Sequence, residues 1–189
     1  MAVLSGYHCL PVPGELLRKI PKRGKRRNGN IKSTSGFPGK GKSFIQKICK
    51  LGGNVLCIGG RPDGEPFKVG VQKPFADRNE TAAVVDINGR SVVSSGIYER
   101  CFKQDGKLYH HILDPHTGYP YDNGLISVTI ISDRSVDGDA LSTTCFALGL
   151  KKGLAFAEKK GVQAVFITKD YELHYTKDFQ KKIKVSQVD

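Results

Sequence analysis

Asp139 and Thr143 are the two side chains whose types and spacing best suit metal chemistry. They stand four residues apart in a segment with a helix-like pattern, so both should project from one helix face. A carboxylate and a hydroxyl are hard oxygen ligands. Such a sparse pair suits Mg²⁺, which completes its shell with water and substrate phosphate. The alternative is that Asp139 is stabilised by the helix dipole and Thr143 packs against its neighbours. Spacing alone favours this structural alternative.

Two adjacent histidines, His110 and His111, offer acid–base chemistry near neutral pH. They lie in a predicted strand, so one side chain should face the core or a site and the other should face solvent. Neither has a partner at the spacing of a zinc site. One of them is therefore a candidate general base, and a hydrogen-bonded strand histidine is the open alternative.

A third candidate is the segment SSGIYER at residues 94–100, which follows a predicted strand. Its small residues and exposable backbone amides can receive a phosphate group or a flat ring. The alternative is an ordinary exit from a strand into a loop.

The elements that must position these residues begin at residue 51, where short β-like runs alternate with Gly, Pro, Asn and Asp. Asn88-Gly89 predicts a two-residue hairpin between two of the strands. Ser135 is predicted to cap the first of two helices. Consecutive hairpins with few helical crossovers predict an α+β fold on a mainly antiparallel sheet with a few packing helices. The predicted strands are 54–58, 67–71, 81–87, 90–94, 107–113, 125–131, 162–168 and 171–176, and the second helix is 151–160.

Residues 1–50 differ from the rest in composition and charge. The net charge of the 189-residue chain is +12, and residues 1–50 carry 12 Lys and Arg against one acid, a net +11. Residues 51–189 carry 18 bases against 17 acids, a net +1. Because the first segment is rich in Pro and Gly and lacks a sustained apolar period, we expect it to be poorly ordered. The sequence therefore divides into a basic segment, 1–50, and a folded domain, 51–189.

The basic segment has two functional interpretations. Its Lys and Arg residues at 22–27 suggest a nucleic-acid-binding arm. No aromatic residues are interleaved with them, as a stacking surface would require, so a solvated linker is favoured. Residues 36–43, GFPGKGKS, match the phosphate-loop pattern G-x-x-x-x-G-K-[ST]. No buried strand precedes this segment, so we interpret it as a chance match.

Composition places the chain among globular proteins. Its hydrophobic content of 39% and charged content of 25% are ordinary for that class. No apolar run reaches the roughly 18 residues that a membrane-spanning helix needs. The first residues also lack the basic start and apolar core of a signal peptide. The sequence as it stands therefore predicts a cytoplasmic protein.

Four motifs, in this order, resemble the FAD:protein FMN transferases, the ApbE-like flavin transferase family. They are LGGNVLCIGG at 51–60, SSGIYERCF at 94–102, HHILDPHTGYP at 110–120 and SVDGDALSTTCFALG at 135–149. The resemblance covers about residues 51–178 and implies an ApbE-like domain related to the T-fold. It also implies an enzyme that binds FAD with Mg²⁺, attaches FMN to a threonine of an acceptor flavoprotein and releases AMP.

The resemblance assigns roles to individual residues. Asp139 and Thr143 match the family's side-chain Mg²⁺ ligands, and His111 is hypothesised to be the general base for the acceptor threonine. A cation that bridges phosphates neutralises the charge that develops as the pyrophosphate opens. The segments that line the family's FAD pocket match five residues: Ser95, Gly96, Tyr98, His111 and Ile112.

The family resemblance also implies a partner and a location. The acceptor would be a flavoprotein such as a subunit of an ion-pumping, membrane-bound redox complex. Family members are often exported and tethered to a membrane, which is the alternative to a cytoplasmic location.

One departure from the family pattern bears on activity. The family has a segment of the D-L-G-G-I-A-K-G-Y kind before its LGGN strand, which supplies another Mg²⁺ ligand and FAD contacts. Residues 1–50 contain nothing similar. We therefore expect a truncated or frame-disrupted member of the family. A segment of the D-L-G-G-I-A-K-G-Y kind just upstream in another reading frame would support this expectation. A non-catalytic FAD-binding remnant is then the alternative to an active transferase. A nucleic-acid-associated protein that uses the basic segment is the third hypothesis.

Overall fold

The computed structural model describes residues 2–3, 47–77, 80–183 and 185–187. The expected poor order of the basic segment, over residues 4–46, and the phosphate-loop match at 36–43 lie outside the described residues. Two helices are present in this part of the chain, α1 (Ser135–Lys159) and α2 (Phe179–Lys182). The strands are β1 (Ala2–Val3), β2 (Lys47–Leu51), β3 (Asn54–Ile58), β4 (Phe67–Gln72), β5 (Thr81–Ile87), β6 (Ser91–Gly96), β7 (Cys101–Gln104), β8 (Lys107–His110), β9 (Leu125–Ser132), β10 (Gln163–Thr168), β11 (Leu173–Tyr175) and β12 (Val185–Gln187).

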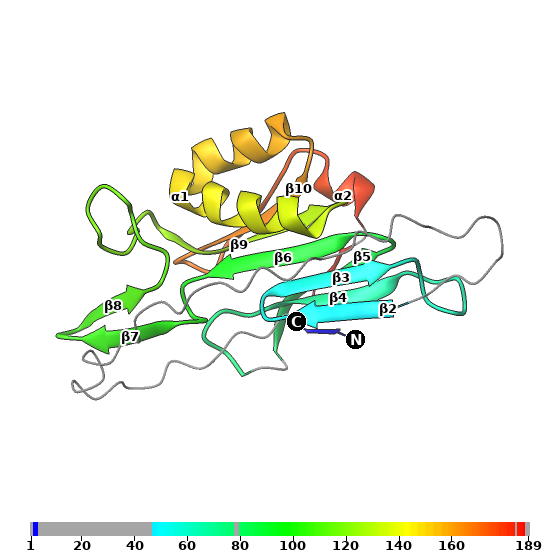
Figure 1. Ribbon diagram of the computed structural model, residues 1–189, viewed down its shortest axis with the longest axis horizontal. Helices are drawn as coiled ribbons and strands as arrows, with labels where there is room; N and C mark the ends of the chain where they lie inside the picture. Colours follow the sequence, from blue (N-terminus) through cyan, green and yellow to red (C-terminus); the bar gives the residue numbers. More distant parts are fainter. Residues whose placement is uncertain (1, 4–46, 78–79, 184, 188–189) are drawn as a thin grey trace, which may run out of the picture.

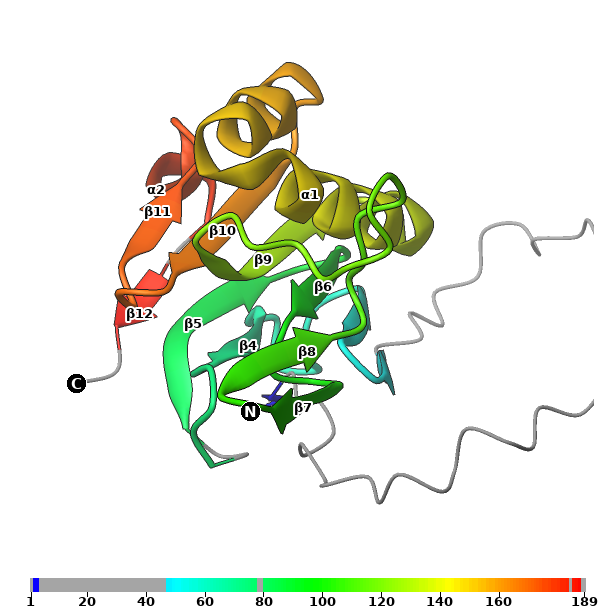
Figure 2. The ribbon, with the colours of Figure 1, turned by 90° about the vertical axis from the view of Figure 1, so that its left-hand side faces the viewer.

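A six-stranded sheet forms the middle layer of the fold. Its strand order is β11-β10-β9-β6-β3-β2, and every neighbouring pair is antiparallel. Helix α1 covers one face of this sheet (Figure 1). A four-stranded sheet of order β1-β4-β5-β12 packs against the other face through a shared apolar core. Strands β7 and β8 form a separate two-stranded ribbon (Figure 2). The predicted α+β fold on a mainly antiparallel sheet is confirmed.

Strand β9 lies at the centre of the core, as its apolar sequence predicted. All eight of its residues are buried. Because side chains alternate between the faces of a strand, Val128 and Ile130 pack with Phe146 of α1. Ile131 points the other way and packs with Val85 of the four-stranded sheet. Burial on both faces explains why apolar residues occur on each face of the strand, although Ser127 and Thr129 interrupt the run.

The prediction of a hairpin at Asn88-Gly89 is wrong. Strand β5 belongs to the four-stranded sheet and β6 to the six-stranded sheet, so the two strands are not paired. Only Gly89 has a positive φ, +61°, whereas the hairpin turn would need positive φ at both positions. The Gly89 amide donates to the carbonyl of Gly59 at 3.0 Å. This turn therefore carries the chain from one sheet to the other.

The start of α1 also differs from the prediction. Arg134 is the N-cap residue and makes no capping hydrogen bond through its side chain, so Ser135 is not the cap. Instead, the hydroxyl of Ser135 exchanges hydrogen bonds with the side-chain amide of Asn54, at 2.7 and 2.9 Å. The predicted division into two helices is present as a break at Gly149, whose φ is +74° and ψ is 177°.

Gly138 lets the first turns of α1 lie directly on the sheet. A Cβ at this position would lie 2.8 Å from Ser132 Oγ and 2.8 Å from Val93 Cγ2. We expect Gly138→Ala to lower the free energy of unfolding by about 1–3 kcal/mol through overpacking, although Ala normally favours a helix over Gly. Urea unfolding measures this change. Ala140→Gly, at an exposed position of the same helix, should cost at most about 1 kcal/mol through helix propensity. A stabilising Gly138→Ala would contradict the packing argument.

Candidate functional site

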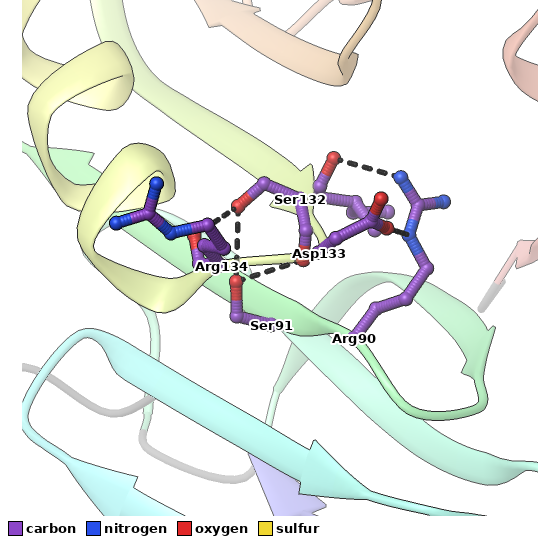
Figure 3. Close-up of polar contacts among 6 residues, drawn as sticks. Arg90, Ser91, Ser132, Asp133 and Arg134 are labelled. Atoms are coloured by element: carbon purple, nitrogen blue, oxygen red, sulfur yellow. Dashed lines mark hydrogen bonds and ion pairs between the residues drawn. The ribbon is translucent and has the colours of Figure 1, made fainter.

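A buried polar network fixes the start of α1 over strands β6 and β9 (Figure 3). The Ser91 hydroxyl lies 3.0 Å from both the hydroxyl and the carbonyl oxygen of Ser132. The Ser132 hydroxyl in turn donates to the carbonyl of Arg134 at 2.9 Å. Outside this buried pair, Arg90 Nε donates to Asp133 Oδ1 at 2.9 Å. These contacts tie the end of β9 to β6 and set where the first turns of α1 begin.

Strand β6 and helix α1 bring three hydroxyl groups together. Ser95 Oγ of β6 lies 2.8 Å from Ser142 Oγ and 3.1 Å from Thr143 Oγ1. Ser142 is buried, whereas Thr143 is exposed. Asp139 is also exposed and stands one helical turn before Thr143, on the same face of α1. The predicted metal pair and the predicted pocket residue Ser95 therefore meet at one place.

The donor set at this place fits Mg²⁺. In the part of the chain that the structure describes, no group of three or more His, Cys, Asp or Glu side chains could hold a metal ion. An ion such as Zn²⁺ in a structural site, which takes four protein ligands, is therefore poorly served by these residues. Mg²⁺ is commonly held by one or two carboxylates plus water and phosphate. Asp139 and Thr143 supply hard oxygen atoms with space around them.

Gly96 and Tyr98 are linked by a close contact. A Cβ at Gly96 would lie 2.6 Å from Cε1 of Tyr98, so only glycine lets the tyrosine ring lie across the backbone. Tyr98 is buried, and its ring packs edge-to-face on Phe75 at a centroid distance of 5.9 Å. Burial raises the pKa of Tyr98, so the phenol stays neutral. Contact of these residues with FAD stays a prediction.

His111 and Ile112 follow the β7–β8 ribbon and face opposite ways. His111 is exposed; its amide donates to the carbonyl of Arg100 at 3.2 Å, and its Nδ1 lies 3.3 Å from the same oxygen. Ile112 is buried in the same core as Tyr98, and its carbonyl accepts from the amide of Tyr121 at 3.1 Å. The expected split between the two histidines is present, because His110 is buried and His111 is exposed.

The structure brings together some candidate residues and leaves others apart. Ser95 and Thr143 are in contact, and Tyr98 and Ile112 share one core cluster. The ribbon joins the two pocket segments, because Cys101 pairs with His110 in register. No hydrogen bond links His111 to Asp139 among the described residues, so a joint role for them stays a prediction.

Glu99 follows Tyr98 directly and is a further candidate residue, to which sequence reasoning assigned no role. It is half-buried, and its Oε1 would lie 2.9 Å from a Cβ placed on Gly53. Burial raises the pKa of the Glu99 carboxyl, while Arg100 acts in the opposite direction. An acid with a raised pKa beside a candidate pocket is typical of functional sites. The available signal was its position directly after Tyr98 in the S-S-G-I-Y-E-R segment.

Replacing Glu99 should reveal its raised pKa as a pH-dependent change in stability. Because the pKa of Glu99 is higher in the folded state than its ordinary value of 4.5, its protonated form contributes stability that is fully present below pH 4.5. This stability is lost as the pH rises through the pKa of the folded state. Gln resembles the protonated acid, so Glu99→Gln should raise Tm at neutral pH, and the difference should vanish below pH 4.5. Thermal unfolding across pH measures this. The exposed Glu65→Gln is the charge-matched control, and an equal response of both variants would contradict the role of burial.

No helix in the described part of the chain is long and apolar enough to cross a membrane.

Comparison with known proteins gives a consistent result. Residues 42–166 match the model of the ApbE family. A FAD:protein FMN transferase of Klebsiella pneumoniae (strain 342) is 47% identical over 127 residues, which cover 67% of this chain and 38% of that protein. A FAD:protein FMN transferase of Treponema pallidum (strain Nichols) is 38% identical over 147 residues, covering 73% of this chain and 41% of that protein. The chain thus spans about two fifths of the length of these relatives.

Solved structures give the same result for the fold. The ApbE protein of Thermotoga maritima superimposes with a TM-score of 0.66 and 33% identity, covering 72% of this chain and 44% of that one. The apo form of the flavinyl transferase ApbE of Pseudomonas stutzeri gives a TM-score of 0.58 at 34% identity, covering 71% and 42%. The predicted ApbE-like fold is confirmed.

Proposed function

Because this chain belongs to the ApbE family, we propose that it acts in Mg²⁺-dependent transfer of FMN from FAD to a threonine hydroxyl of an acceptor flavoprotein. AMP is the second product. The observation that carries the proposal is the meeting of Ser95 with Thr143, on the helix face that also bears Asp139. The names of the relatives, FAD:protein FMN transferases, support the flavin substrate.

Asp139 and Thr143 are the residues that would hold Mg²⁺. A bound Mg²⁺ neutralises charge on the pyrophosphate of FAD and orients it. Ser95 and Ser142 fix the Thr143 side chain on the sheet side, because the three hydroxyls lie within hydrogen-bonding distance in a chain. Gly96 and Tyr98 extend this surface as one wall for FAD. His111, which is exposed after the β7–β8 ribbon, supplies the second wall, and Ile112 supports it from the core that it shares with Tyr98.

The reaction transfers a flavin phosphate between two oxygen atoms. A bond forms between the acceptor threonine Oγ and the phosphorus of the FMN phosphate. The bond from that phosphorus to the bridging oxygen breaks, and the bridging oxygen leaves with AMP. The threonine proton must pass to a base, and the exposed imidazole of His111 is the residue that we assign to this role.

The acceptor and the place of action follow from the same family. We propose a flavoprotein acceptor, such as a subunit of a membrane redox complex. It presents its threonine on the exposed side of α1 at Asp139 and Thr143. A cytoplasmic location and an exported, membrane-tethered one remain the two alternatives for the enzyme itself.

The test is an assay of the full chain with FAD, Mg²⁺ and a threonine-bearing acceptor peptide. The nucleotides and the peptide are separated by chromatography. AMP and FMN-peptide formed in equal amounts, and lost with EDTA, support the proposal. Binding of FAD without AMP would instead support a non-catalytic FAD-binding module, and the absence of both would overturn a flavin function for this chain.

The role of His111 is tested in the same assay. His111→Ala should lower the transfer rate by about 10²–10⁴-fold at neutral pH, the usual contribution of a general base. His174→Ala, on the edge strand β11, is the matched control and should keep the rate. Full activity of His111→Ala would remove the general-base assignment and leave the rest of the proposal standing.

A further inference from the structure

The outer edge of strand β8 carries backbone groups that no neighbouring strand pairs with. Along an antiparallel ribbon, hydrogen-bonded pairs of residues alternate with pairs that are not hydrogen-bonded. The amide of His111 donates to the carbonyl of Arg100 at 3.2 Å, which marks a hydrogen-bonded pair. The register places Leu108 and His110 in the other kind of pair, so their N–H and C=O groups point away from β7. These outward groups have no hydrogen-bond partner in the part of the chain that the structure describes.

A cavity of about 420 Å³ runs along this outer edge. All four residues of β8, 107–110, line the cavity, although their side chains alternate between the two faces of the ribbon. The edge of the strand is the part that both faces share, so the cavity follows the edge. Loop residues 119–122 line it as well, and so does Leu125 at the start of β9. In both views of the ribbon diagram, β8 lies on the side of the ribbon nearer α1 (Figures 1 and 2).

The chain itself shows which chemistry fits this edge. Just beyond β8, the amide of Tyr121 donates to the carbonyl of Ile112 at 3.1 Å, and the amide of Asp114 donates to the carbonyl of Tyr119 at 2.8 Å. This short segment is antiparallel to the continuation of β8 and lies on the same outer edge as Leu108. After Tyr121 the chain leaves the edge and enters β9. An extended backbone segment is therefore the partner that the remaining part of the edge can accept.

The two faces of the ribbon make different demands on such a segment. Leu108 is half-buried and packs against the apolar core, so its face suits an apolar side chain. Lys107, Tyr109 and the following His111 alternate with it and belong to the opposite face. Lys107 is exposed and has no ion-pair partner within the described residues, so a carboxylate opposite it would be favourable. A residue opposite Tyr109 is a diagonal neighbour of His111, to which we assign the general-base role.

We propose that the outer edge of β8 binds an extended segment of the acceptor protein as an added antiparallel strand. The proposal rests on the proposed flavin transfer, because it names where that acceptor docks. The antiparallel direction matches every strand pair of the ribbon and of the six-stranded sheet. One apolar residue exchanges two backbone hydrogen bonds with Leu108. The residue before it is the acceptor threonine, opposite Tyr109, and the residue after it is an acid, opposite Lys107.

The first test uses the full chain and a short fluorescein-labelled peptide with Thr-Val-Asp at its centre. Unlabelled peptides compete for the site, and fluorescence anisotropy measures their affinities. N-methylation of the peptide valine removes the N–H that faces Leu108 and should weaken binding by about tenfold or more. N-methylation of the peptide aspartate, whose N–H faces away from β8, should change the affinity by less than about twofold. A peptide with the reverse order, Asp-Val-Thr, should bind about threefold more weakly because its acid no longer meets Lys107.

Two proline variants identify the edge that binds the peptide. Leu108→Pro removes the N–H that points into the cavity and leaves the pairing with β7 intact, because this N–H lies outside the ladder of the ribbon. It should weaken binding of the unmodified peptide by about tenfold or more. Lys103→Pro is the matched control, because Lys103 faces Leu108 in register and its N–H points to the opposite edge of the ribbon. This variant should keep the affinity. The N-methylated peptides remain decisive even if Leu108→Pro unfolds.

The outcomes separate the docking edge from the flavin chemistry. Equal affinity of the two N-methylated peptides overturns the added strand, as does the absence of saturable binding. Equal losses in Leu108→Pro and Lys103→Pro overturn the assignment to β8. Peptide binding with the expected pattern but without AMP release from FAD removes the flavin function and keeps the docking edge. AMP release together with peptide binding that ignores the valine N–H keeps the flavin function and overturns the docking edge.

Discussion

Asp139→Asn should lower Mg²⁺-dependent AMP release from FAD by roughly 100-fold or more. The carboxylate is the only charged group of the proposed Mg²⁺ ligand pair, and Asn keeps its size while removing the charge. A bound metal ion contributes several kcal/mol of transition-state stabilisation, and each 1.36 kcal/mol corresponds to about tenfold in rate. The measurement is the rate of AMP release as Mg²⁺ is titrated. Partial recovery at high Mg²⁺ would identify the loss as one of metal affinity.

Asp137→Asn is the matched control for this experiment. Asp137 lies in the same turn of α1 but about 200° away around the helix, and it faces Arg134 at 3.8 Å. Asp137→Asn and Asp139→Asn each remove one negative charge near the N-terminus of α1, so both change the interaction with the helix dipole in the same direction. Equal rate losses in both variants would show that Asp139 acts through general electrostatics and would contradict its role as a ligand.

Phe146→Ala should be the most destabilising of the substitutions considered, lowering the free energy of unfolding by about 3–5 kcal/mol. Phe146 is completely buried between α1 and the six-stranded sheet, in one cluster with Ile130 and Phe166. Its ring also meets His110 edge-on, at a centroid distance of 6.2 Å. Removing it leaves a cavity under the helix that carries Asp139 and Thr143. Urea unfolding followed by circular dichroism measures the change.

Leu148→Ala separates this effect from any general loss of helix stability. Leu148 lies two residues further along α1 and is 38% exposed, so its truncation should cost less than about 1 kcal/mol. The slope of unfolding free energy against urea should remain equal in both variants, which shows that the folded states bury similar areas. A Phe146→Ala protein as stable as Leu148→Ala would mean that the core collapses around the missing ring.

Most strands were predictable because their residues alternate or are continuously apolar. Five of the seven residues at 125–131 are apolar, and the structure explains this through burial of β9 on both faces. Strand β2 was missed because four of its five residues are exposed and Ile48 alone is half-buried. Its sequence therefore shows no alternation between a buried and an exposed face. Strand β7 was missed for the same reason, since three of its four residues are exposed.

Of the turns Asn88-Gly89 and Asp105-Gly106, the sequence predicted a hairpin at the first, whereas the structure forms one at the second. At Asp105-Gly106, φ is +49° and +75°, and the chain forms the tight β7–β8 hairpin. Asn88-Gly89 has the more typical hairpin sequence, yet it links two different sheets. Local sequence could not distinguish these cases, because pairing of β5 with β4 and β12, and of β6 with β3 and β9, is decided by long-range packing.

Part of the geometry of the candidate site could be predicted from the sequence. Helical spacing placed Asp139 and Thr143 on one face, and the structure agrees. The contact between Ser95 and Thr143 joins positions 48 residues apart, so no local pattern could reveal it. Glu99 was missed because its distinguishing property, a pKa raised by burial, depends on the fold around it and not on its neighbours in sequence.

The isolated β7–β8 ribbon gives the molecule two regions of unequal protection against amide hydrogen exchange. The amides and carbonyls of β9 are bonded to β6 on one side and β10 on the other, so they should exchange only when the whole domain opens. The ribbon pairs with no third strand among the described residues and should open by itself.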